Sequence, residues 1–166
     1  KAAEQGEATA QCKLGIMYEE GRGVGESDTE AAEWYRRAAE QGEATAQFNL
    51  GILYEEGRGV EQNDIEATEW YRKAANQGIP VAQFNLGLRY EEGRGIEQNS
   101  VRAAEWYQKA AEQGFVDAQF NLGTMYYDGQ GVKQDYAKAA MWYRNAAEQG
   151  DAEAQFNLGV MYYDGQ

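Results

Sequence analysis

The chain repeats itself every 36 residues, and this period constrains the fold more than any other feature of the sequence. The hexapeptide AQFNLG occupies residues 46–51, 82–87, 118–123 and 154–159, and the related AQCKLG occupies residues 10–15. The pair Trp-Tyr and the triplets EQG and NQG recur at the same spacing without an insertion. A fixed period of this size is typical of a solenoid, in which each unit buries its apolar face only against its neighbours. The sequence therefore predicts an array of stacked repeats.

Each unit is predicted to contain two helices, because its apolar residues recur at helical spacing. In the second unit, the first helix covers residues 43–56 and has a core face of Ala46, Gln47, Leu50, Gly51 and Tyr54. The second helix covers about residues 64–77 and has a core face of Ala67, Trp70, Tyr71 and Ala74.

Polar residues, glycines and one proline mark the predicted helix ends. Good N-cap residues stand before every second helix, at Ser27, Asn63, Asn99 and Asp135. Ser27 with Glu30 and Asn63 with Glu66 have the capping-box pattern, which Arg102 and Lys138 break. Glycines at 42, 78, 114 and 150 fit the position after a helix, and Pro80 fits a first turn.

Another set of glycines lies inside the first helices, at positions 15, 51, 87, 123 and 159. Each costs about 1 kcal/mol relative to alanine in a helix interior. A glycine at this position in every unit is expected to serve packing, by letting the Trp or Tyr of a second helix lie against bare backbone.

The pattern AQFNLGxxYxxGxGV, followed by a capped AxxWYRKAAEQG, resembles the Sel-one-like repeat (SLR) family, which is related to the tetratricopeptide repeats. The resemblance covers the whole chain. It implies an all-α fold, a right-handed superhelical solenoid of antiparallel helix pairs whose first helices line a concave surface. It also implies an adaptor that holds other proteins, as in bacterial signalling, host contact and eukaryotic quality control. Disulfide-rich bacterial members are a poor match, because Cys12 is the only cysteine.

The register of the repeats divides the single repeat domain, residues 1–166, into segments. These are the tail of a preceding helix at 1–6, four repeats at 7–42, 43–78, 79–114 and 115–150, and a partial repeat at 151–166. The lone last helix is expected to leave an apolar face uncovered around Ala154, Leu158 and Tyr162. We therefore expect end-to-end self-association, or a cap supplied by residues of a longer protein.

The charge of the chain excludes several classes of partner. Twenty-eight acidic and fifteen basic residues give a net charge of −13, which argues against nucleic acid and against anionic lipid. No apolar run approaches the roughly 20 residues of a membrane-spanning helix, so direct membrane insertion is not expected. The chain begins at Lys1 rather than at a methionine and looks like part of a longer array, so periplasmic or secreted and cytoplasmic locations both stay open.

Few residues favour catalysis. The chain has no histidine, and its only serines, Ser27 and Ser100, begin second helices and do not start an S-x-x-K motif. The segment GRGVG at 21–25 superficially resembles a phosphate loop, but it follows a helix and has acidic neighbours. Adjacent carboxylates such as Glu55 and Glu56 diverge by about 100° on a helix, which favours a solvated face over a metal site. We expect no enzyme activity, no metal and no cofactor.

The face of the first helix opposite the predicted core is the candidate partner-binding surface. Its residues are Thr45, Phe48, Asn49, Ile52, Glu55, Glu56, Val81, Phe84, Asn85, Leu88, Glu91, Glu92, Asp117, Phe120, Asn121, Thr124, Tyr127 and Asp128. Its columns diverge between units, as in Thr, Thr, Val, Asp, Glu at position 45 and its equivalents, whereas the core columns hardly vary. This pattern fits either a position-specific groove or surface drift. The phenylalanine column fits packing between successive first helices or, if exposed, contact with apolar anchors of a partner.

The motif YEEGRG at 18–23, 54–59 and 90–95 changes to YYDGQG at 126–131. Its tyrosines are expected in the core and its first glycines at helix ends. Arginines 22, 58 and 94 are expected to offset the glutamates just before them, whose charge is unfavourable at a helix C-terminus. The change at 127–130 would remove a glutamate and its arginine together. The glutamate and tyrosine positions stay candidates for recognition.

Three functions remain, in order of preference. The first is a protein-interaction adaptor that binds a protein or peptide with basic and apolar anchors along the first helices. The alternative is a structural spacer with no groove ligand that assembles through its ends. An enzyme is a distant third.

Overall fold

The computed structural model describes residue 3, residues 6–163 and residue 165, and within them it contains nine α-helices and no strand. The helices are α1 Ala8–Glu20, α2 Asp28–Glu40, α3 Ala44–Glu56, α4 Asp64–Asn76, α5 Pro80–Glu92, α6 Ser100–Glu112, α7 Val116–Asp128, α8 Tyr136–Glu148 and α9 Ala152–Tyr163. The predicted all-α fold of paired helices is confirmed. The predicted helix tail at 1–6 falls mostly outside the described residues, as do residues 164 and 166 of the last repeat.

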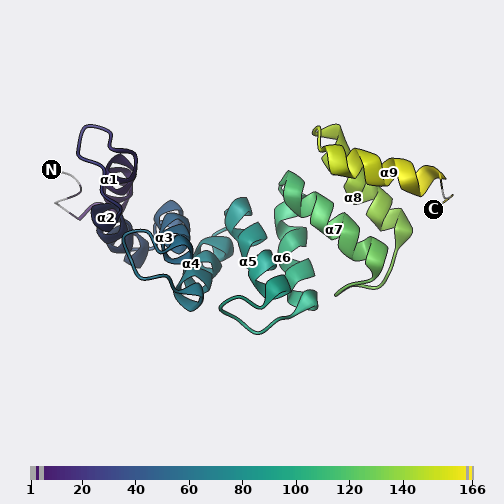
Figure 1. Cartoon of the computed structure of the whole chain (residues 1–166), viewed down its shortest axis with the longest axis horizontal. Coiled ribbons are helices and arrows are strands. Elements are labelled where there is room, and N and C mark those ends of the chain that lie inside the picture. The colour runs from purple at the N-terminus through teal and green to yellow at the C-terminus, as the bar shows by residue number, and fades with distance from the viewer. Residues whose placement is uncertain (1–2, 4–5, 164, 166) are drawn as a thin grey trace. The chain divides into compact units, whose positions relative to one another are not determined.

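The chain forms two compact units, residues 1–82 with 94–96, and residues 83–93 with 97–166. In the first unit, α2 packs against both α1 and α3, and α3 packs against α4. In the second unit, α7 packs against α6 and α8, and α8 packs against α9. Figure 1 shows these neighbouring helices following one another in chain order within each unit. The second helices α2 and α8 are thus each covered by the first helices of their own repeat and of the next.

Side-chain caps begin the second helices at the predicted residues. The Ser27 hydroxyl accepts a hydrogen bond from the N–H of Glu30 at 3.3 Å, and Asn63, Asn99 and Asp135 cap their helices similarly. The predicted capping boxes are wrong, however. The N–H of Ser27 donates to the carbonyl of Tyr18 at 2.9 Å, so it does not need a glutamate side chain. This bond recurs in each later repeat, which explains why Arg102 and Lys138 are tolerated at the box position.

Glycines end both kinds of helix, as predicted. Gly42 follows α2 with φ 91°, and Gly57 follows α3 with φ 70°. Both angles lie in the left-handed region, which residues with a Cβ rarely adopt. Pro80 is the first residue of α5, where its missing N–H leaves no helical bond unmade.

The glycines inside the first helices receive the tyrosine, and not the tryptophan, of the second helix. A Cβ on Gly51 would lie 2.7 Å from the ring of Tyr71, and one on Gly123 would lie 2.8 Å from the ring of Tyr143. Gly15 and Gly87 have the same relation to tyrosines 35 and 107. Among the described residues, no atom lies within 4 Å of the corresponding point at Gly159. The expected packing role therefore holds in four repeats.

The core differs from the predicted register at two positions. Ala46, Leu50 and the second-helix residues Ala67, Trp70, Tyr71 and Ala74 are buried as predicted. Tyr54, by contrast, is only half-buried at the edge of the core, and its hydroxyl accepts a hydrogen bond from Arg36 at 2.8 Å. Leu53 is fully buried instead, in a cluster that includes Ala31 and Tyr35 of the preceding second helix, α2.

The exposed face of α9 was predicted only in part: Tyr162 is exposed as expected, whereas Leu158 is half-buried. Ala154 was expected to be uncovered, but it is fully buried, together with Met161. Both residues belong to a buried cluster with Tyr143. Phe156 and Tyr163 are the most exposed apolar side chains of this helix, at 71% and 92%, and Tyr162 is 60% exposed.

Candidate functional site

In the second and third repeats, the arginine of the YEEGRG motif joins the repeat to the one before it. The Arg58 guanidinium donates two hydrogen bonds to Asp28, at 2.7 and 3.2 Å, and a third to Glu19 at 3.1 Å. Asp28 begins α2 and Glu19 lies near the end of α1, so both partners belong to the first repeat. The hydrogen bonds with Asp28 raise the pKa of Arg58 above its ordinary value. A two-pronged arginine–carboxylate pair fixes orientation as well as adding energy.

The same joint links the second repeat to the third. Arg94 pairs with Asp64 at 3.0 Å and with Glu55 at 3.4 Å. The glycine after each arginine allows this close approach. A Cβ on Gly59 or Gly95 would lie only 2.2 or 2.0 Å from the carbonyl oxygen of Asp28 or Asp64. The Gly-Arg-Gly segments at 57–59 and 93–95 therefore form contacts between repeats.

The sequence predicted that each arginine pairs with the glutamates just before it, and this accounts for only part of these contacts. Arg22 does pair with Glu20 at 2.7 Å, and Arg58 also contacts Glu56 at 3.3 Å. Gln130 takes the place of the arginine in the fourth repeat, and Ser100 takes the place of the aspartate that the arginine would bind. Gly131 still lies against the Ser100 carbonyl. The arginine of the joint and its aspartate partner in the preceding repeat are thus both replaced between the third and fourth repeats.

The first glutamate of the motif accepts a hydrogen bond from the buried tyrosine of its own repeat. Tyr35 donates to Glu19 at 2.6 Å, Tyr71 donates to Glu55 at 2.5 Å, and Tyr107 donates to Glu91. Burial and the bond to Glu91 raise the pKa of Tyr107 well above its usual range, and Tyr35 behaves in the same way. Glu55 and Glu91, which were predicted to face a partner, thus also accept hydrogen bonds within their own repeat.

The fourth repeat replaces this pair with a neutral one. Tyr127 stands where the earlier repeats have glutamate, and its ring packs edge-on against Tyr136 at 5.3 Å between centroids. The Tyr143 hydroxyl lies 3.0 Å from the hydroxyl of Thr124 instead. Thr124 donates its own proton to the Phe120 carbonyl, so Tyr143 is the donor in the pair.

The predicted surface residues all keep some exposure to solvent. Five have exposed side chains: Thr45, Glu56, Glu92, Asp117 and Asp128. The others are half-buried: Phe48, Asn49, Ile52, Glu55, Val81, Phe84, Asn85, Leu88, Glu91, Phe120, Asn121, Thr124 and Tyr127. The phenylalanines contact the second-helix tyrosines, as between Phe48 and Tyr71 at 5.7 Å and Phe120 and Tyr143 at 5.7 Å. These contacts differ from the predicted packing between successive first helices, which is found at Phe84, whose ring lies 5.1 Å from the ring of Phe115 at the start of the next first helix.

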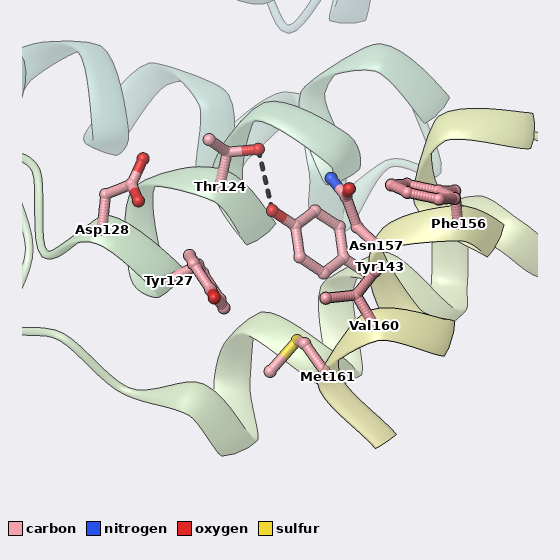
Figure 2. Close-up of a pocket in the computed structure, with 8 residues that line it drawn as sticks. All are labelled: Thr124, Tyr127, Asp128, Tyr143, Phe156, Asn157, Val160 and Met161. Carbon is pink, nitrogen blue, oxygen red and sulfur yellow. Dashed lines mark hydrogen bonds between the residues drawn. The ribbon is translucent and has the colours of Figure 1, made fainter. Parts of the chain in front are cut away.

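Three of the predicted residues meet in one pocket of the second unit. Thr124, Tyr127 and Asp128 come from α7, and Figure 2 shows them facing the same space as side chains of α8 and α9. The pocket has a volume of about 250 Å³. Sequence reasoning did not include its other lining residues, which are Tyr143, Phe156, Asn157, Val160 and Met161. Residues 156, 157 and 160 fall in the columns already assigned to the surface, so extending those columns to the last helix would have found them.

Metal and membrane sites were also sought in the described part of the chain. Residues 3, 6–163 and 165 contain no group of three or more acidic or cysteine side chains that could hold a metal ion. None of the helices in these ranges has the length and hydrophobicity of a membrane span. Cys12 is a buried free thiol, and burial, followed by the charge of Glu43, raises its pKa to about 12.

Comparison with solved structures places this arrangement in a known class. The chain superposes with a TM-score of 0.94 and 45% identity on c5321, a protective antigen of uropathogenic Escherichia coli with an SLR fold. It superposes with a TM-score of 0.91 and 44% identity on a Sel1 repeat protein from Oxalobacter formigenes. An immunity protein of Pseudomonas aeruginosa, Pa5087, matches at a TM-score of 0.56 and 26% identity.

The alignments cover most of this chain but only part of some relatives. They include 98%, 95% and 94% of this chain, and 35%, 65% and 58% of the three relatives in the same order. No curated protein matches the chain.

The sequence profile of the Sel1 repeat matches residues 8–43, 44–79, 80–115, 116–151 and 152–166. The chain therefore belongs to the Sel1-repeat family, and the resemblance inferred from its motifs is confirmed. It is an all-helical SLR solenoid built from five repeats with a period of 36 residues.

Proposed function

We propose that this chain is an adaptor that binds a protein or peptide along the exposed face of its first helices. Sel1 repeats form scaffolds that generally mediate protein interactions and are typically non-catalytic. The observation that carries the proposal is the contrast between two sides of each first helix. The side against the second helices keeps the same alanine, leucine and glycine in each repeat, whereas on the solvent side the columns of residues 45 and 52 vary from repeat to repeat.

The contacts described above narrow the residues available to a partner. Glu55 and Glu91 bond with buried tyrosines, so they support the fold rather than recognition. Thr45, Glu56 and Asp117 extend into solvent and are the better candidates. The half-buried phenylalanines between them present ring edges that could pack against an apolar side chain.

Charge indicates the chemistry of the partner. A net charge of −13 attracts basic segments, speeds their encounter and disfavours nucleic acid. A segment with apolar anchors beside lysine or arginine fits an acidic surface with aromatic edges. The names of two relatives, a protective antigen and an immunity protein, are compatible with work carried out through protein contacts.

The experiment is a capture assay that reverses charge on the first helices. Glu56 and Glu92 are the last residues of α3 and α5, and Glu56→Lys with Glu92→Lys is expected to abolish capture of a basic partner. Glu40 and Glu112 are the last residues of α2 and α6 and are also exposed. Glu40→Lys with Glu112→Lys makes the same charge change on second helices and is expected to leave capture intact. Equal capture by both double variants would refute binding along the first helices.

A second candidate, a structural spacer that assembles through its ends, is favoured by the aromatic side chains of α9. Phe156 and Tyr163 are largely exposed, and exposed aromatic surface of this kind often marks an interface. A spacer of this kind would form concentration-dependent oligomers in light scattering. Phe156→Ser with Tyr163→Ser would return them to monomers, whereas a monodisperse monomer of the unaltered chain would count against this candidate.

A further inference from the structure

We propose that the pocket between α7, α8 and α9 is the recognition pocket of the array, where a bound peptide inserts one aliphatic side chain and places an adjacent lysine or arginine at Asp128. This inference rests on the proposed adaptor function and names the chemistry of its partner. The pocket has a volume of about 250 Å³, which is larger than a leucine or isoleucine side chain.

Two residues that line the pocket distinguish the fourth repeat from the first three. Thr124 stands where the first three repeats have Ile, Ile and Leu, so the side chain at this position is smaller and has a hydroxyl in place of an ethyl or isopropyl group. Tyr127 stands where those repeats have glutamate. The Tyr143 hydroxyl then bonds with Thr124 rather than with a carboxylate, and Figure 2 shows this bond at the edge of the space.

The inner surface of the pocket suits an apolar side chain. Tyr127, Phe156, Val160 and Met161 present rings, methyl groups and a thioether to the space. The buried Tyr143 hydroxyl that borders the space already has a partner, because it lies 3.0 Å from the hydroxyl of Thr124. An aliphatic side chain can therefore enter without leaving a buried hydroxyl unpaired.

Asp128 supplies the charge at the rim. In the equivalent position of the first two repeats, Glu20 and Glu56 form ion pairs with Arg22 and Arg58. The fourth repeat has Gln130 at the arginine position, and among the described residues no lysine or arginine lies within ion-pair distance of Asp128. Asp128 is exposed, so its carboxylate can pair with a cation that the partner provides.

The test measures the affinity of fluorescein-labelled Gly/Ser peptides that carry an adjacent Leu-Lys pair, by anisotropy at low salt. The peptide is expected to bind, and replacing its leucine with serine should weaken binding about tenfold or more, because a buried aliphatic side chain is lost. Replacing its lysine with glutamate should also weaken binding. Asp128→Asn should lower affinity about threefold and reduce the salt dependence, as expected for a rim charge. Glu148→Gln removes an exposed carboxylate at the end of α8, outside the pocket lining, and should leave affinity within about twofold.

The decisive variant gives the fourth repeat the residues of the third. Thr124→Leu with Tyr127→Glu is expected to fold, because the third repeat has both residues at these positions. It should remove the advantage of leucine over serine in the peptide, even though the added glutamate increases the negative charge. Circular dichroism of the variant confirms that the helices are retained.

Four results would refute the proposed role of the pocket in recognition. They are no binding of the Leu-Lys peptide, equal affinity for the leucine and serine peptides, an unchanged leucine preference in the Thr124→Leu/Tyr127→Glu variant, and dimers of the chain that this variant dissociates. The last result would show that a second copy of the chain, and not a peptide, occupies the pocket. Capture that depends on Glu56 and Glu92 but not on the pocket would overturn this inference alone and leave the adaptor function standing.

Discussion

The buried tyrosine of the second helix bonds with a charged group in the third repeat and with a neutral group in the fourth. Tyr107 donates to the Glu91 carboxylate, whereas Tyr143 donates to the Thr124 hydroxyl. Hydrogen bonds with charged groups contribute about 1.5–3 kcal/mol, and those between neutral groups contribute about 0.5–1.5 kcal/mol. The same side chain therefore stabilises the two repeats to different extents.

This difference predicts the outcome of two matched substitutions. Tyr107→Phe should lower the free energy of unfolding by about 2 kcal/mol, and Tyr143→Phe should lower it by about 1 kcal/mol. Both changes remove one oxygen and keep the ring that packs on the first-helix glycine. Urea unfolding followed by circular dichroism gives both values. An equal loss in the two variants would show that the charge of Glu91 does not strengthen the bond.

The raised pKa values of the tyrosines predict how stability depends on pH. Burial raises the pKa of Tyr35, Tyr107 and Tyr143 above the ordinary value of 10.0. The unfolded chain loses these protons near that pH, whereas the folded chain keeps them. The stabilisation is therefore complete below about pH 10 and is lost as the pH rises above it.

Tyrosinate absorbance during an alkaline titration measures this effect. Tyr35, Tyr107 and Tyr143 should ionise only as the helical signal disappears. Ionisation of all twelve tyrosines in a single step while the chain is still folded would contradict the prediction.

The helix pairs are held together by a glycine that faces a tyrosine ring. A Cβ at Gly123 would lie 2.8 Å from the ring of Tyr143, whereas one at Gly159 would meet no described atom within 4 Å. Gly123→Ala should destabilise the fold by about 1–3 kcal/mol, because the overlap outweighs the gain in helix propensity. Gly159→Ala should stabilise it by up to about 1 kcal/mol. Thermal or urea unfolding of the two variants gives the sign of each change, and two changes of the same sign would refute the packing role.

The joint between repeats predicts a contrast between two arginines. Arg58 bonds with Asp28 and Glu19 of the preceding repeat, whereas Arg22 contacts only Glu20 and its side chain is 75% exposed. Arg58→Gln should cost about 1 kcal/mol at low salt and less at high salt, and Arg22→Gln should cost below about 0.5 kcal/mol.

The combination Asp28→Ser with Arg58→Gln reproduces the residues found between the third and fourth repeats. Either single substitution already breaks the pair between Arg58 and Asp28. The double variant should therefore lose less stability than the sum of the losses in the two single variants. Strict additivity in urea unfolding would show that Asp28 and Arg58 do not act together.

Helix positions and caps could be predicted from the sequence, because each depends on neighbours a few residues apart along the chain. The packing glycines could be predicted because a glycine recurs inside the first helix of every unit. The joint could not be predicted in this way. Arg58 meets Asp28 across 30 positions, and the partner is set by how one repeat stacks on the next. The choice of Leu53 rather than Tyr54 for the core depends on the same stacking. Three of the pocket residues were predicted from their column, and the rest were missed because α9 was considered only as an end of the array.

Taken as a whole molecule, the chain separates conserved packing from variable surface. The buried tyrosines, the glycines and the Arg58 joint hold the repeats together, and they leave Thr45, Asp117 and their neighbours free to differ. A solenoid suits this separation, because each repeat needs only its neighbours for stability. The first helices can therefore change one position at a time without loss of the fold.

Site-specific photo-crosslinking measures directly which face a partner contacts. A photoreactive amino acid at Thr45 or Asp117 places the probe on the first helices, and at Ile65 or Val101 it places the probe on exposed positions of the second helices. The intact protein carrying each probe is irradiated with a basic partner identified by affinity purification. We predict that the partner is crosslinked from Thr45 or Asp117 and not from Ile65 or Val101. Crosslinks from the second helices alone, or from none of the four positions, would contradict binding along the first helices.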